Sequence, residues 1–271
     1  MKVKTLKAGS TKLYNLPAEK SLRFWRRQGW LADLVYGDPP FFIGRTGYDD
    51  FKDKASAEDT EAFTQRWLGD AADLLSDTGT LIVNCYDNTA AETVVFLKSR
   101  GLHLARWCIW HYRFGQNQPK NYIQSKQHVL IFAKDADNRT MNADAILELS
   151  DRASKYNDPR TQNKKQGRAG LRMPFDVWQG EGFNRVQGNA RERWKSKQFP
   201  TGHDNQIPLG YMTRLIMAHT NEGDRVCDPF LGSGTTGLVA STLGREFRGG
   251  DRSMRTLRSA QGRIRSADRG A

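Results

Sequence analysis

The chain has 271 residues, a mean hydropathy of -0.70, and 42 lysine and arginine residues against 30 aspartate and glutamate residues. No apolar run reaches the length of a membrane span and no signal-peptide core opens the chain, so we expect neither a membrane-spanning nor a secreted protein. The net charge of +12 favours a polyanionic partner, with acidic lipid as the rival to nucleic acid.

Strand and helix signals alternate along the first half of the chain, as expected of an α/β sheet. The predicted elements are, in chain order, strands over 4–8 and 30–36, a helix over 58–75, a strand over 80–85, a helix over 89–100, and strands over 105–112 and 128–133. The last two strands are expected to form an antiparallel hairpin. Trp107, Trp110 and Tyr112 fit a core strand better than the wall of a binding pocket.

The strand over 30–36 is followed by Gly37 and then by Asp38-Pro39-Pro40-Phe41. Each proline fixes φ and lacks an N–H, so the carbonyl groups here have no role in a sheet ladder and can act as acceptors beside the Asp38 carboxylate. Phe41 offers a flat face for stacking. The motif predicts a site for an amino group, against the alternative of a plain Pro-Pro turn.

Apolar periodicity gives way to Arg, Lys, Gln, Asn and Gly between about residues 136 and 200. Residues 151–200 contain 12 basic and 5 acidic residues. The positive excess of this segment is more than half of the net charge of the chain. We expect this segment to contact phosphates first and bases second, against the alternative of a solvated loop. The predicted contacts are Arg160, Lys164, Lys165, Arg168, Arg172, Arg191, Arg193 and Lys195.

A second motif begins with the short apolar strand over 226–227 and continues through Asp228 into a glycine-rich turn over 230–237. Its glycines fit G-x-G-x-x-G, and Asp251 follows at about the separation of a ribose-binding acid. A dinucleotide is disfavoured because Asp228 would repel a pyrophosphate, whereas it would suit an ammonium or sulfonium group. A P-loop is not predicted, since no Gly-Lys-Ser/Thr ending follows.

The chain has three cysteines, Cys85, Cys108 and Cys227, without C-x-x-C spacing. They are interpreted as small core residues in a reducing cytoplasm, and no metal site is predicted from them.

Together, the two motifs resemble those of the DNA amino-methyltransferases, in the permuted order that places the catalytic Asp-Pro-Pro-aromatic first and the glycine-rich cofactor loop last. Three other segments are similar to that family: residues 202–209 to its His-Pro-x-Gln-x-Pro segment, 175–178 to its Asp-Val-Trp, and 244–251 to its second cofactor strand. Asp204 stands where the family has the first proline of that segment, and Asp251 where glutamate is more usual. The resemblance covers most of the chain.

The resemblance implies a Rossmann-like methyltransferase fold, an α/β structure with a mixed seven-stranded doubly wound sheet in permuted order and an inserted target-recognition region. The expected regions are the catalytic half over 1–135, the target-recognition insertion over 136–201 and the cofactor-binding half over 202–271. The third strand of the cofactor half is expected to come from residues 4–10, with Ser10 where the family usually has aspartate. Because ligands bind beyond the carboxyl ends of strands, Asp38 and Asp228 are expected at adjacent strand ends.

The cofactor implied by the resemblance is S-adenosyl-L-methionine. The residues expected to bind it are Ser10, His203, Gln206, Pro208, Asp228, Phe230, Gly232, Gly234, Thr235, Thr236 and Asp251. A helix cap or a surface group explains His203 equally well. The arginine-rich residues after 251 are expected to form an amphipathic helix that packs on the sheet.

The expected reaction is methyl transfer to the N6 amino group of a flipped-out adenine in double-stranded DNA, with Asp38, Pro39, Pro40 and Phe41 as catalytic residues. Asp38 and the Pro39 carbonyl would accept the two N–H groups of the amine and free its delocalised lone pair, while Phe41 stacks on the base. Asp-Pro-Pro-Phe resembles the adenine enzymes, whereas the N4-cytosine enzymes more often have serine first.

Two alternatives stay open: N4-cytosine methylation, and a catalytically inactive DNA-binding or dinucleotide-binding protein. Charge alone does not exclude RNA as the substrate. The expected location is the cytoplasm of a bacterial or phage-infected bacterial cell. The partners considered besides DNA are a second copy of the chain, as a homodimer, and a cognate restriction endonuclease, with no membrane.

Overall fold

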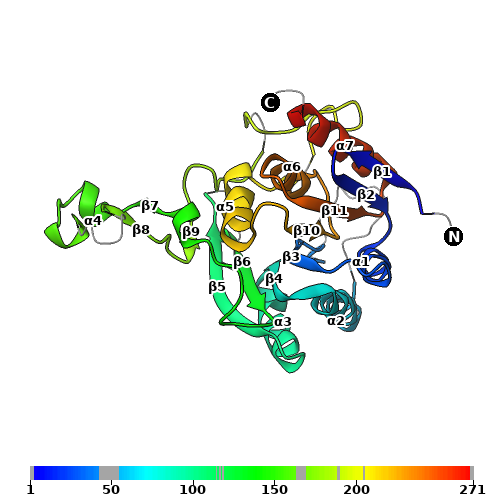
Figure 1. Ribbon diagram of the computed structural model, residues 1–271, viewed down its shortest axis with the longest axis horizontal. Helices are drawn as coiled ribbons and strands as arrows, with labels where there is room; N and C mark the ends of the chain where they lie inside the picture. The colour runs from blue at the N-terminus through cyan, green and yellow to red at the C-terminus, as the bar shows by residue number, and fades with distance from the viewer. Residues whose placement is uncertain are drawn as a thin grey trace.

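The structure is a computed structural model that describes residues 3–42, 55–113, 115, 117, 119–162, 169–187, 190–203 and 205–268. A nine-stranded mixed sheet runs through its centre (Figure 1). From one edge to the other, the strands are β1 (Thr5–Ala8), β2 (Thr11–Asn15), β11 (Glu246–Asp251), β10 (Arg225–Asp228), β3 (Ala32–Gly37), β4 (Leu75–Cys85), β6 (Lys126–Ala133), β5 (His103–His111) and β9 (Val177–Trp178).

The five neighbouring strands β2, β11, β10, β3 and β4 are all parallel. β6 is antiparallel to both β4 and β5, which confirms the hairpin predicted from the two apolar runs. In β3, residues 34–37 are all buried, as expected of a central parallel strand that is covered on both faces. The carboxyl ends of the five parallel strands therefore lie along one edge of the sheet.

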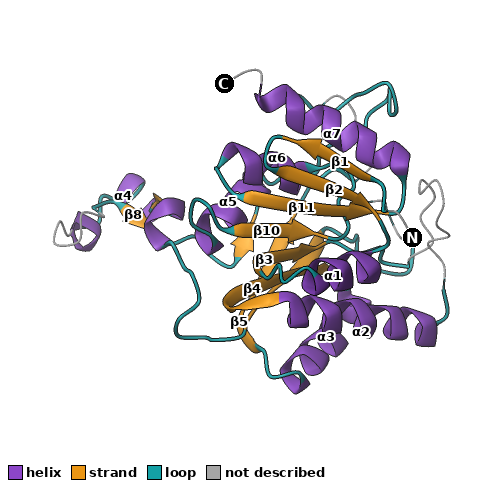
Figure 2. Ribbon diagram, turned by 45° about the vertical axis from the view of Figure 1, so that its right-hand side comes forward, coloured by secondary structure: helices purple, strands orange, loops and turns teal. Residues whose placement is uncertain are grey.

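Helices cover both faces of the sheet (Figure 2). On one face, α1 (Ala18–Arg27), α2 (Ala57–Leu74) and α3 (Asp87–Ser99) contribute Trp25, Trp67 and Leu97 to one hydrophobic cluster. On the other face, α5 (Leu209–His219), α6 (Thr235–Thr242) and α7 (Met254–Asp268) contribute Tyr211, Val239 and Leu257 to a second cluster. The expected Rossmann-like, doubly wound fold is confirmed.

The sheet has nine described strands where seven were expected. The two additional strands, β1 and β9, are the short strands at the two edges. β9 lies within the segment expected to be the insertion, yet it pairs in parallel with β5, where Trp178 is opposite Trp110. Residues 177–178 are thus part of the central sheet and not of a separate insertion.

The expected role of Ser10 is wrong because residues 4–10 are not the third strand of the cofactor half. They form the edge strand β1 and a turn in which Gly9 has φ +55°, and β2 then returns beside β11. Asn15 at the end of β2 is opposite Asp251, so β2 reaches the carboxyl edge with Asn15. Ser10 is exposed at the other end of β2, away from the strand ends.

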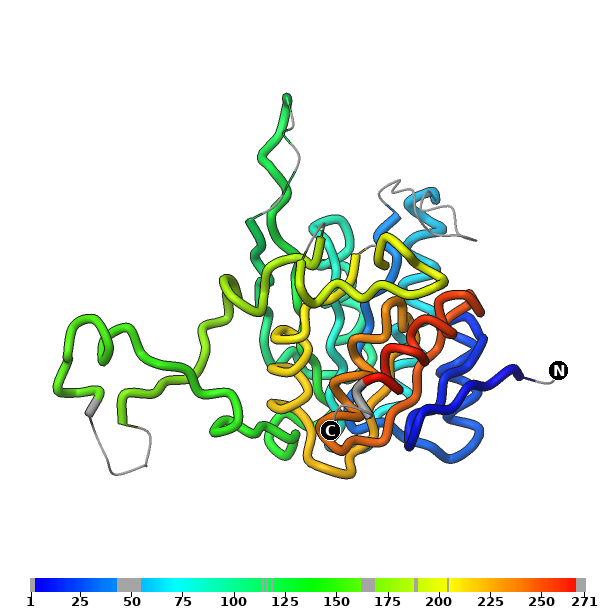
Figure 3. The backbone as a smooth tube through the Cα atoms, turned by 90° about the horizontal axis from the view of Figure 1, so that it is seen from above, coloured from blue at the N-terminus to red at the C-terminus, as the bar shows by residue number. Residues whose placement is uncertain are grey.

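An arm projects from the side of the molecule and contains part of the predicted insertion (Figures 1 and 3). It contains β7 (Glu148–Leu149), α4 (Asp151–Ser154), η2 (Pro159–Gln162) and β8 (Leu171–Arg172), and η1 (Ala143–Ile146) lies at its base against α5. β7 and β8 form a separate two-stranded sheet. Ion pairs join Glu148 to Arg172 in the arm at 2.8 Å and to Arg214 of α5 at 3.1 Å, so the base of the arm is tied to the body.

In the part of the chain that the structure describes, no helix has the length and apolar character needed to cross a membrane.

Candidate active site

Four parallel strands end side by side and bring polar residues from distant parts of the sequence together. β2 ends at Asn15, β11 at Asp251 and β10 at Asp228, and Asp38 follows β3. β3 and β10 are adjacent, with Leu34 opposite Val226. This pairing confirms the expectation that Asp38 and Asp228 lie at neighbouring strand ends, although 190 positions of sequence separate them.

A cavity of about 560 Å³ opens at this edge, which is within the usual range for small-molecule sites. Its lining includes carboxylates from two strand ends, Asp38 and Asp251, and the backbone of Gly232. Phe63, Phe199 and Phe230 add flat apolar faces to the wall. Such a cavity suits an elongated ligand that has an aromatic ring, hydroxyl groups and a positive charge.

A second, smaller cavity of about 30 Å³ also has Asp38 in its lining. Its other walls come from Pro39, Phe41, Trp110 and Gln127 and from the residues over 185–186 and 205–207. A nucleobase needs more room than this, so binding of a base requires the lining to move. Asp38 therefore lies between a large ligand cavity and a smaller one that the aromatic side chains border.

The glycine-rich turn brings its backbone to the large cavity. Gly232 has φ +48° and Gly234 has φ +79°, a left-handed region in which residues with a side chain are strained. A Cβ atom at Gly234 would lie 2.8 Å from the Cβ of Ala260 on α7. The turn thus needs glycine at position 234 both for its conformation and for the close packing of α7.

Asp228 does not line the large cavity but holds the glycine-rich turn together. Its Oδ1 accepts a hydrogen bond from the Phe230 N–H at 2.8 Å, and its Oδ2 accepts one from the Thr236 hydroxyl at 2.6 Å. Burial raises the pKa of this carboxyl to about 7, against the lowering effect of the two hydrogen bonds. The structure does not bring Asp228 into contact with the cavity where a charged ligand group would bind.

The Asp228→Asn variant is expected to be more stable than the parent at pH 8 by about 2 to 4 kcal/mol and equally stable near pH 4. A carboxyl whose folded pKa is raised to about 7 stabilises the fold most at low pH, and this stability is lost as the pH rises through that value. An asparagine keeps both hydrogen bonds, because its amide can donate to the Thr236 hydroxyl. Unfolding curves from pH 4 to 8 test this, and parallel curves for the two proteins would contradict the assignment.

Asp251 combines contact with the turn and contact with the cavity. Its Oδ2 accepts from the Gly232 N–H at 3.2 Å and its Oδ1 accepts from the Ser253 N–H at 2.8 Å. Burial raises its pKa to about 6, while these hydrogen bonds lower it. Asn15 donates to the carbonyls of Asp251 and Arg252 and thereby fixes the end of β2 against the end of β11.

The buried Arg263 of α7 supports the glycine-rich turn from behind. Its guanidinium donates to the Ser233 carbonyl at 3.3 Å and to the Thr235 hydroxyl at 2.8 Å, and its side chain is 3% exposed. Burial lowers its pKa to about 10. Thr235 in turn donates to the Ile207 carbonyl, so the turn is linked to the segment before α5.

The free energy of unfolding of the Arg263→Met variant is expected to be lower than that of the parent by about 1 to 3 kcal/mol, because the acceptors of the turn lose their buried donor. A matched control is Arg258→Met, since Arg258 lies on the same helix but is exposed. Thermal unfolding of both variants measures the difference. Equal stability of the two variants would show that Arg263 does not support the turn.

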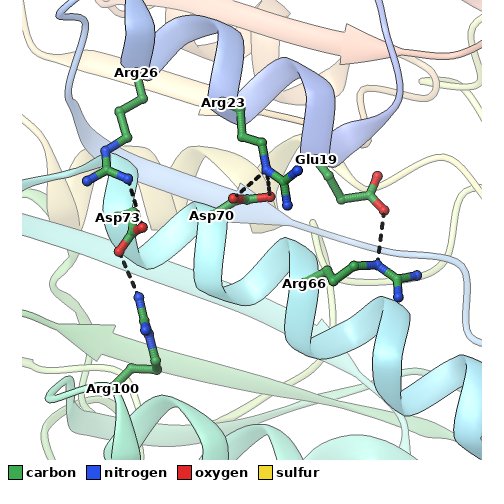
Figure 4. A network of polar contacts seen from close by, with 7 residues as sticks. All are labelled: Glu19, Arg23, Arg26, Arg66, Asp70, Asp73 and Arg100. Atoms are coloured by element: carbon green, nitrogen blue, oxygen red, sulfur yellow. Dashed lines mark hydrogen bonds and ion pairs between the residues drawn. The ribbon is translucent and has the colours of Figure 1, made fainter.

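One wall of the large cavity is formed by α1 and α2, which ion pairs hold together (Figure 4). Arg23 donates to both oxygens of Asp70 at 2.9 Å. Asp73 joins Arg26 of α1 and Arg100 beyond α3 at 2.8 and 2.9 Å. The first turn of α1 and the side chains of Arg23, Phe63 and Arg66 all line the cavity.

Phe41, the last residue of the Asp-Pro-Pro-Phe motif, and the next residue, Phe42, both pack against aromatic rings. Phe41 stacks on Tyr86, with ring centroids 4.3 Å apart, and Phe42 contacts Phe63 edge-on. Phe42 has φ +54°, an unusual conformation for a bulky residue of the kind found at functional sites. Phe41 also lines the small cavity.

The segment before α5 borders both cavities. His203 packs on Phe199 and approaches Gly232, since its Cε1 lies 3.7 Å from the position that a Cβ of Gly232 would take. Pro208 is the buried N-cap residue of α5. Gln206 accepts from the Trp194 N–H and donates to the Glu192 carbonyl, and it lines the small cavity and not the large one. Gln206 thus connects the segment before α5 to residues 192–194 and does not line the cavity where the cofactor was expected.

The predicted nucleic-acid contacts are spread over two places. Arg160 and Arg172 are in the arm, where they pair with Asp158 and Glu148. Arg191, Arg193 and Lys195 are in the segment that reaches Phe199 at the large cavity, and Arg191 and Lys195 are exposed. Lys164, Lys165 and Arg168 lie outside the described residues.

The sequence motifs missed several residues of the large cavity. The first turn of α1 and the residues Arg252, Ser253 and Thr256 line it but contain no motif. The helical pattern of α1, in which Leu22 and Trp25 are buried three residues apart, was a signal for that wall. Phe63 lies in the helix predicted over 58–75, and the sequence pattern does not distinguish a core position of a helix from a position in a cavity wall.

A family model described as DNA methylase, for N6 and N4 methyltransferases, matches residues 32–262. The chain belongs to this family. It is 30% identical over 231 residues to the DNA adenine methyltransferase YhdJ of Escherichia coli strain K12, a match that covers 80% of this chain and 71% of that protein.

Two solved structures of similar fold extend this comparison. A complex titled M1.HpyAVI-SAM matches with a TM-score of 0.61 and 20% identity, over 94% of this chain and 99% of that chain. The PvuII DNA methyltransferase, titled cytosine-N4-specific, matches with a TM-score of 0.67 and 13% identity, over 95% of this chain and 87% of that chain. At these identities the structures support the fold of this member of the family.

Proposed function

We propose that this protein transfers a methyl group from S-adenosyl-L-methionine to the N6 amino group of a flipped-out adenine in double-stranded DNA. The observation that carries the proposal is the position of Asp38, which lines both the large cavity and the small one. A donor in the first cavity and a base in the second would meet at this carboxylate. The relationship to an adenine methyltransferase supports the choice of adenine.

The residues of the large cavity fit the proposed cofactor. The flat faces of Phe230 and Phe63 suit an adenine ring, and Asp251 offers a carboxylate to ribose hydroxyls. Gly232 allows the ligand to approach the backbone. When bound, the cofactor supplies an electrophilic methyl group.

The catalytic residues would act by binding and orienting the amine. The Asp38 carboxylate and the Pro39 carbonyl accept its two N–H groups, which turns the nitrogen toward tetrahedral geometry and frees the lone pair for in-line attack. Phe41 stacks on the ring and is itself held by Tyr86. Because the small cavity is lined by aromatic side chains, entry of the base excludes water and strengthens these contacts.

Residues 136–201 are proposed as the target-recognition region, between the catalytic half over 1–135 and the cofactor-binding half over 202–271. The arm and the segment over 190–203 carry most of its described cations, and Arg185 lines the small cavity. The segment over 190–203 borders the large cavity through Phe199, so DNA bound there would lie near the reacting atoms. Residues 177–178 are the exception, since they belong to the central sheet.

Replacing Arg191 and Lys195 together by glutamine is expected to weaken DNA binding uniformly across sequences. The slope of log affinity against log salt concentration should fall by about 2, one for each phosphate that the variant no longer neutralises. Binding titrations at several salt concentrations measure this slope. The matched control replaces Lys4 and Lys12, at the edge hairpin, by glutamine. A slope that falls in this control but not in the Arg191 and Lys195 variant would contradict the proposal.

Analysis of the nucleosides of DNA incubated with the protein and S-adenosyl-L-methionine tests the proposed reaction. N6-methyladenine is the expected product. The second candidate, N4-cytosine methylation, is favoured by the structural similarity to a cytosine-N4-specific enzyme and would give N4-methylcytosine instead. Methylation of RNA but not of DNA would overturn the substrate class. A homodimer, a cognate restriction endonuclease and a cytoplasmic location stay predictions.

A further inference from the structure

Gln127, the second residue of β6, lines the small cavity together with Asp38. Its cross-strand neighbour Trp110 lines the same cavity. The side chain of Gln127 is only 4% exposed. An amide at this depth has lost its water partners, so each of its polar atoms needs a partner from the protein or from a ligand.

The amide nitrogen of Gln127 is available to such a ligand. Its Oε1 faces the Asn84 Nδ2 at 3.5 Å, whereas its Nε2 has no hydrogen-bond partner among the residues that the structure describes. Gln206 in the same lining differs, because its amide oxygen accepts from Trp194 and its amide nitrogen donates to Glu192. Gln127 thus offers the small cavity an N–H donor.

Buried neighbours set the orientation of this amide. The Tyr211 hydroxyl donates to the Asn84 Oδ1 at 2.5 Å, and the Asn84 Nδ2 donates to the Tyr36 hydroxyl at 2.8 Å. Asn84 therefore presents its nitrogen toward Gln127, which keeps the Gln127 oxygen on that side. The carboxylate of Asp38, in the same cavity, also favours the amide nitrogen over the oxygen.

We propose that Gln127 positions the target base by donating a hydrogen bond from Nε2 to the ring nitrogen beside the amino-bearing carbon, which is N1 in adenine. This inference rests on the proposed function. Asp38 accepts from the amine and Gln127 donates to the adjacent ring nitrogen, so the pair recognises a donor next to an acceptor. Thymine and the Watson–Crick edge of guanine carry an N–H at that ring position and would be rejected.

A neutral donor suits this position better than a cation. Full protonation of the ring nitrogen would draw the lone pair of the amine into the ring and remove its nucleophilicity. An amide holds the ring without giving up its proton. Loss of the Gln127 amide is therefore expected to raise KM for DNA and to lower kcat/KM, with a smaller change in kcat.

The test combines a protein variant with the removal of one atom from the substrate. Wild-type protein first marks the target sequence in natural DNA, and duplexes are then made with adenine, 1-deazaadenine or 7-deazaadenine at the methylated position. The variant is Gln127→Met, which keeps the length of the side chain but lacks the donor. The matched control is Gln65→Met, since Gln65 is exposed on α2 and bonds only within its helix to Glu61.

On the adenine duplex, Gln127→Met should lower kcat/KM about 10-fold or more, whereas Gln65→Met should match the wild type. For the wild type, kcat/KM on the 1-deazaadenine duplex should be lower than on the adenine duplex by a similar factor. For Gln127→Met, kcat/KM should be the same on the two duplexes. The 7-deazaadenine duplex should react alike with both proteins. Equal sensitivity of both proteins to 1-deazaadenine, or an unchanged kcat/KM in Gln127→Met, would overturn the inference.

Failure of the proposed function gives a different result. If wild-type protein leaves no N6-methyladenine in natural DNA, the adenine reaction itself is wrong, before any analogue is used. If the product is N4-methylcytosine, the same comparison with 3-deazacytosine decides the role of Gln127.

Discussion

The Asp38→Ala variant is expected to lose methyl transfer by about 10³-fold or more while it keeps its affinity for S-adenosyl-L-methionine within about threefold. Asp38 is the proposed acceptor for the amine, and its loss removes an interaction that is needed only by the reacting base. The glycine-rich turn and Asp251, which are proposed to hold the cofactor, are joined by the hydrogen bond from the Gly232 N–H to Asp251. Cofactor binding should therefore survive.

Single-turnover kinetics and calorimetric titration with the cofactor measure these two quantities separately. Asp38→Asn serves as a second variant, since it keeps the size of the side chain and one acceptor oxygen but removes the charge. Asp77→Ala is the control, because Asp77 is exposed at the other end of the neighbouring strand β4. Full activity of Asp38→Ala would remove Asp38 from the mechanism, and loss of both activity and cofactor binding would assign it to the cofactor site.

The Asp251→Ala variant should show the opposite pattern, with cofactor affinity reduced about 10- to 100-fold, as expected for the loss of hydrogen bonds to a charged group. The same change also leaves the N–H groups of Gly232 and Ser253 without their acceptor. The rate at saturating cofactor should change much less than in Asp38→Ala. An unchanged dissociation constant would show that Asp251 does not contact the ligand.

The affinity of the parent protein for the cofactor should also fall as the pH decreases through about 6, because burial raises the pKa of Asp251 to that value. Below it the carboxyl is protonated and accepts hydrogen bonds from ribose hydroxyls less well. Titrations at pH 5 and pH 8 detect this change. Asp251→Asn, which cannot ionise, should have an affinity that depends less on pH.

Much of the site was predictable because each motif directly follows a strand that the sequence marks clearly. The apolar run before Asp38 and the run before Asp228 both read as buried strands, and the adjacency of their ends followed from the position of ligand sites in doubly wound sheets. Phe230, Gly232 and Asp251 were likewise expected at the cavity and do line it.

Other residues could not be placed because the sequence pattern does not show how the chain turns. Ser10 was expected at a strand end, but the turn at Gly9 makes a hairpin and gives that position to Asn15. Asp228 was expected to meet a charged group directly, yet its oxygens bond within the turn. Gln127 is part of no motif, and only the packing of β3, β4 and β6 against α5 places it in the cavity that Asp38 also lines.

A crystal structure of the protein with S-adenosyl-L-methionine tests the central claim most directly. The claim is that one edge of the sheet binds the methyl donor next to Asp38, which accepts hydrogen bonds from the amino group of the base. We expect the ligand in the large cavity, with its ribose at Asp251, its adenine at Phe230 and its methyl group directed toward Asp38. A ligand bound elsewhere, or one whose methyl group points away from Asp38, would contradict this account.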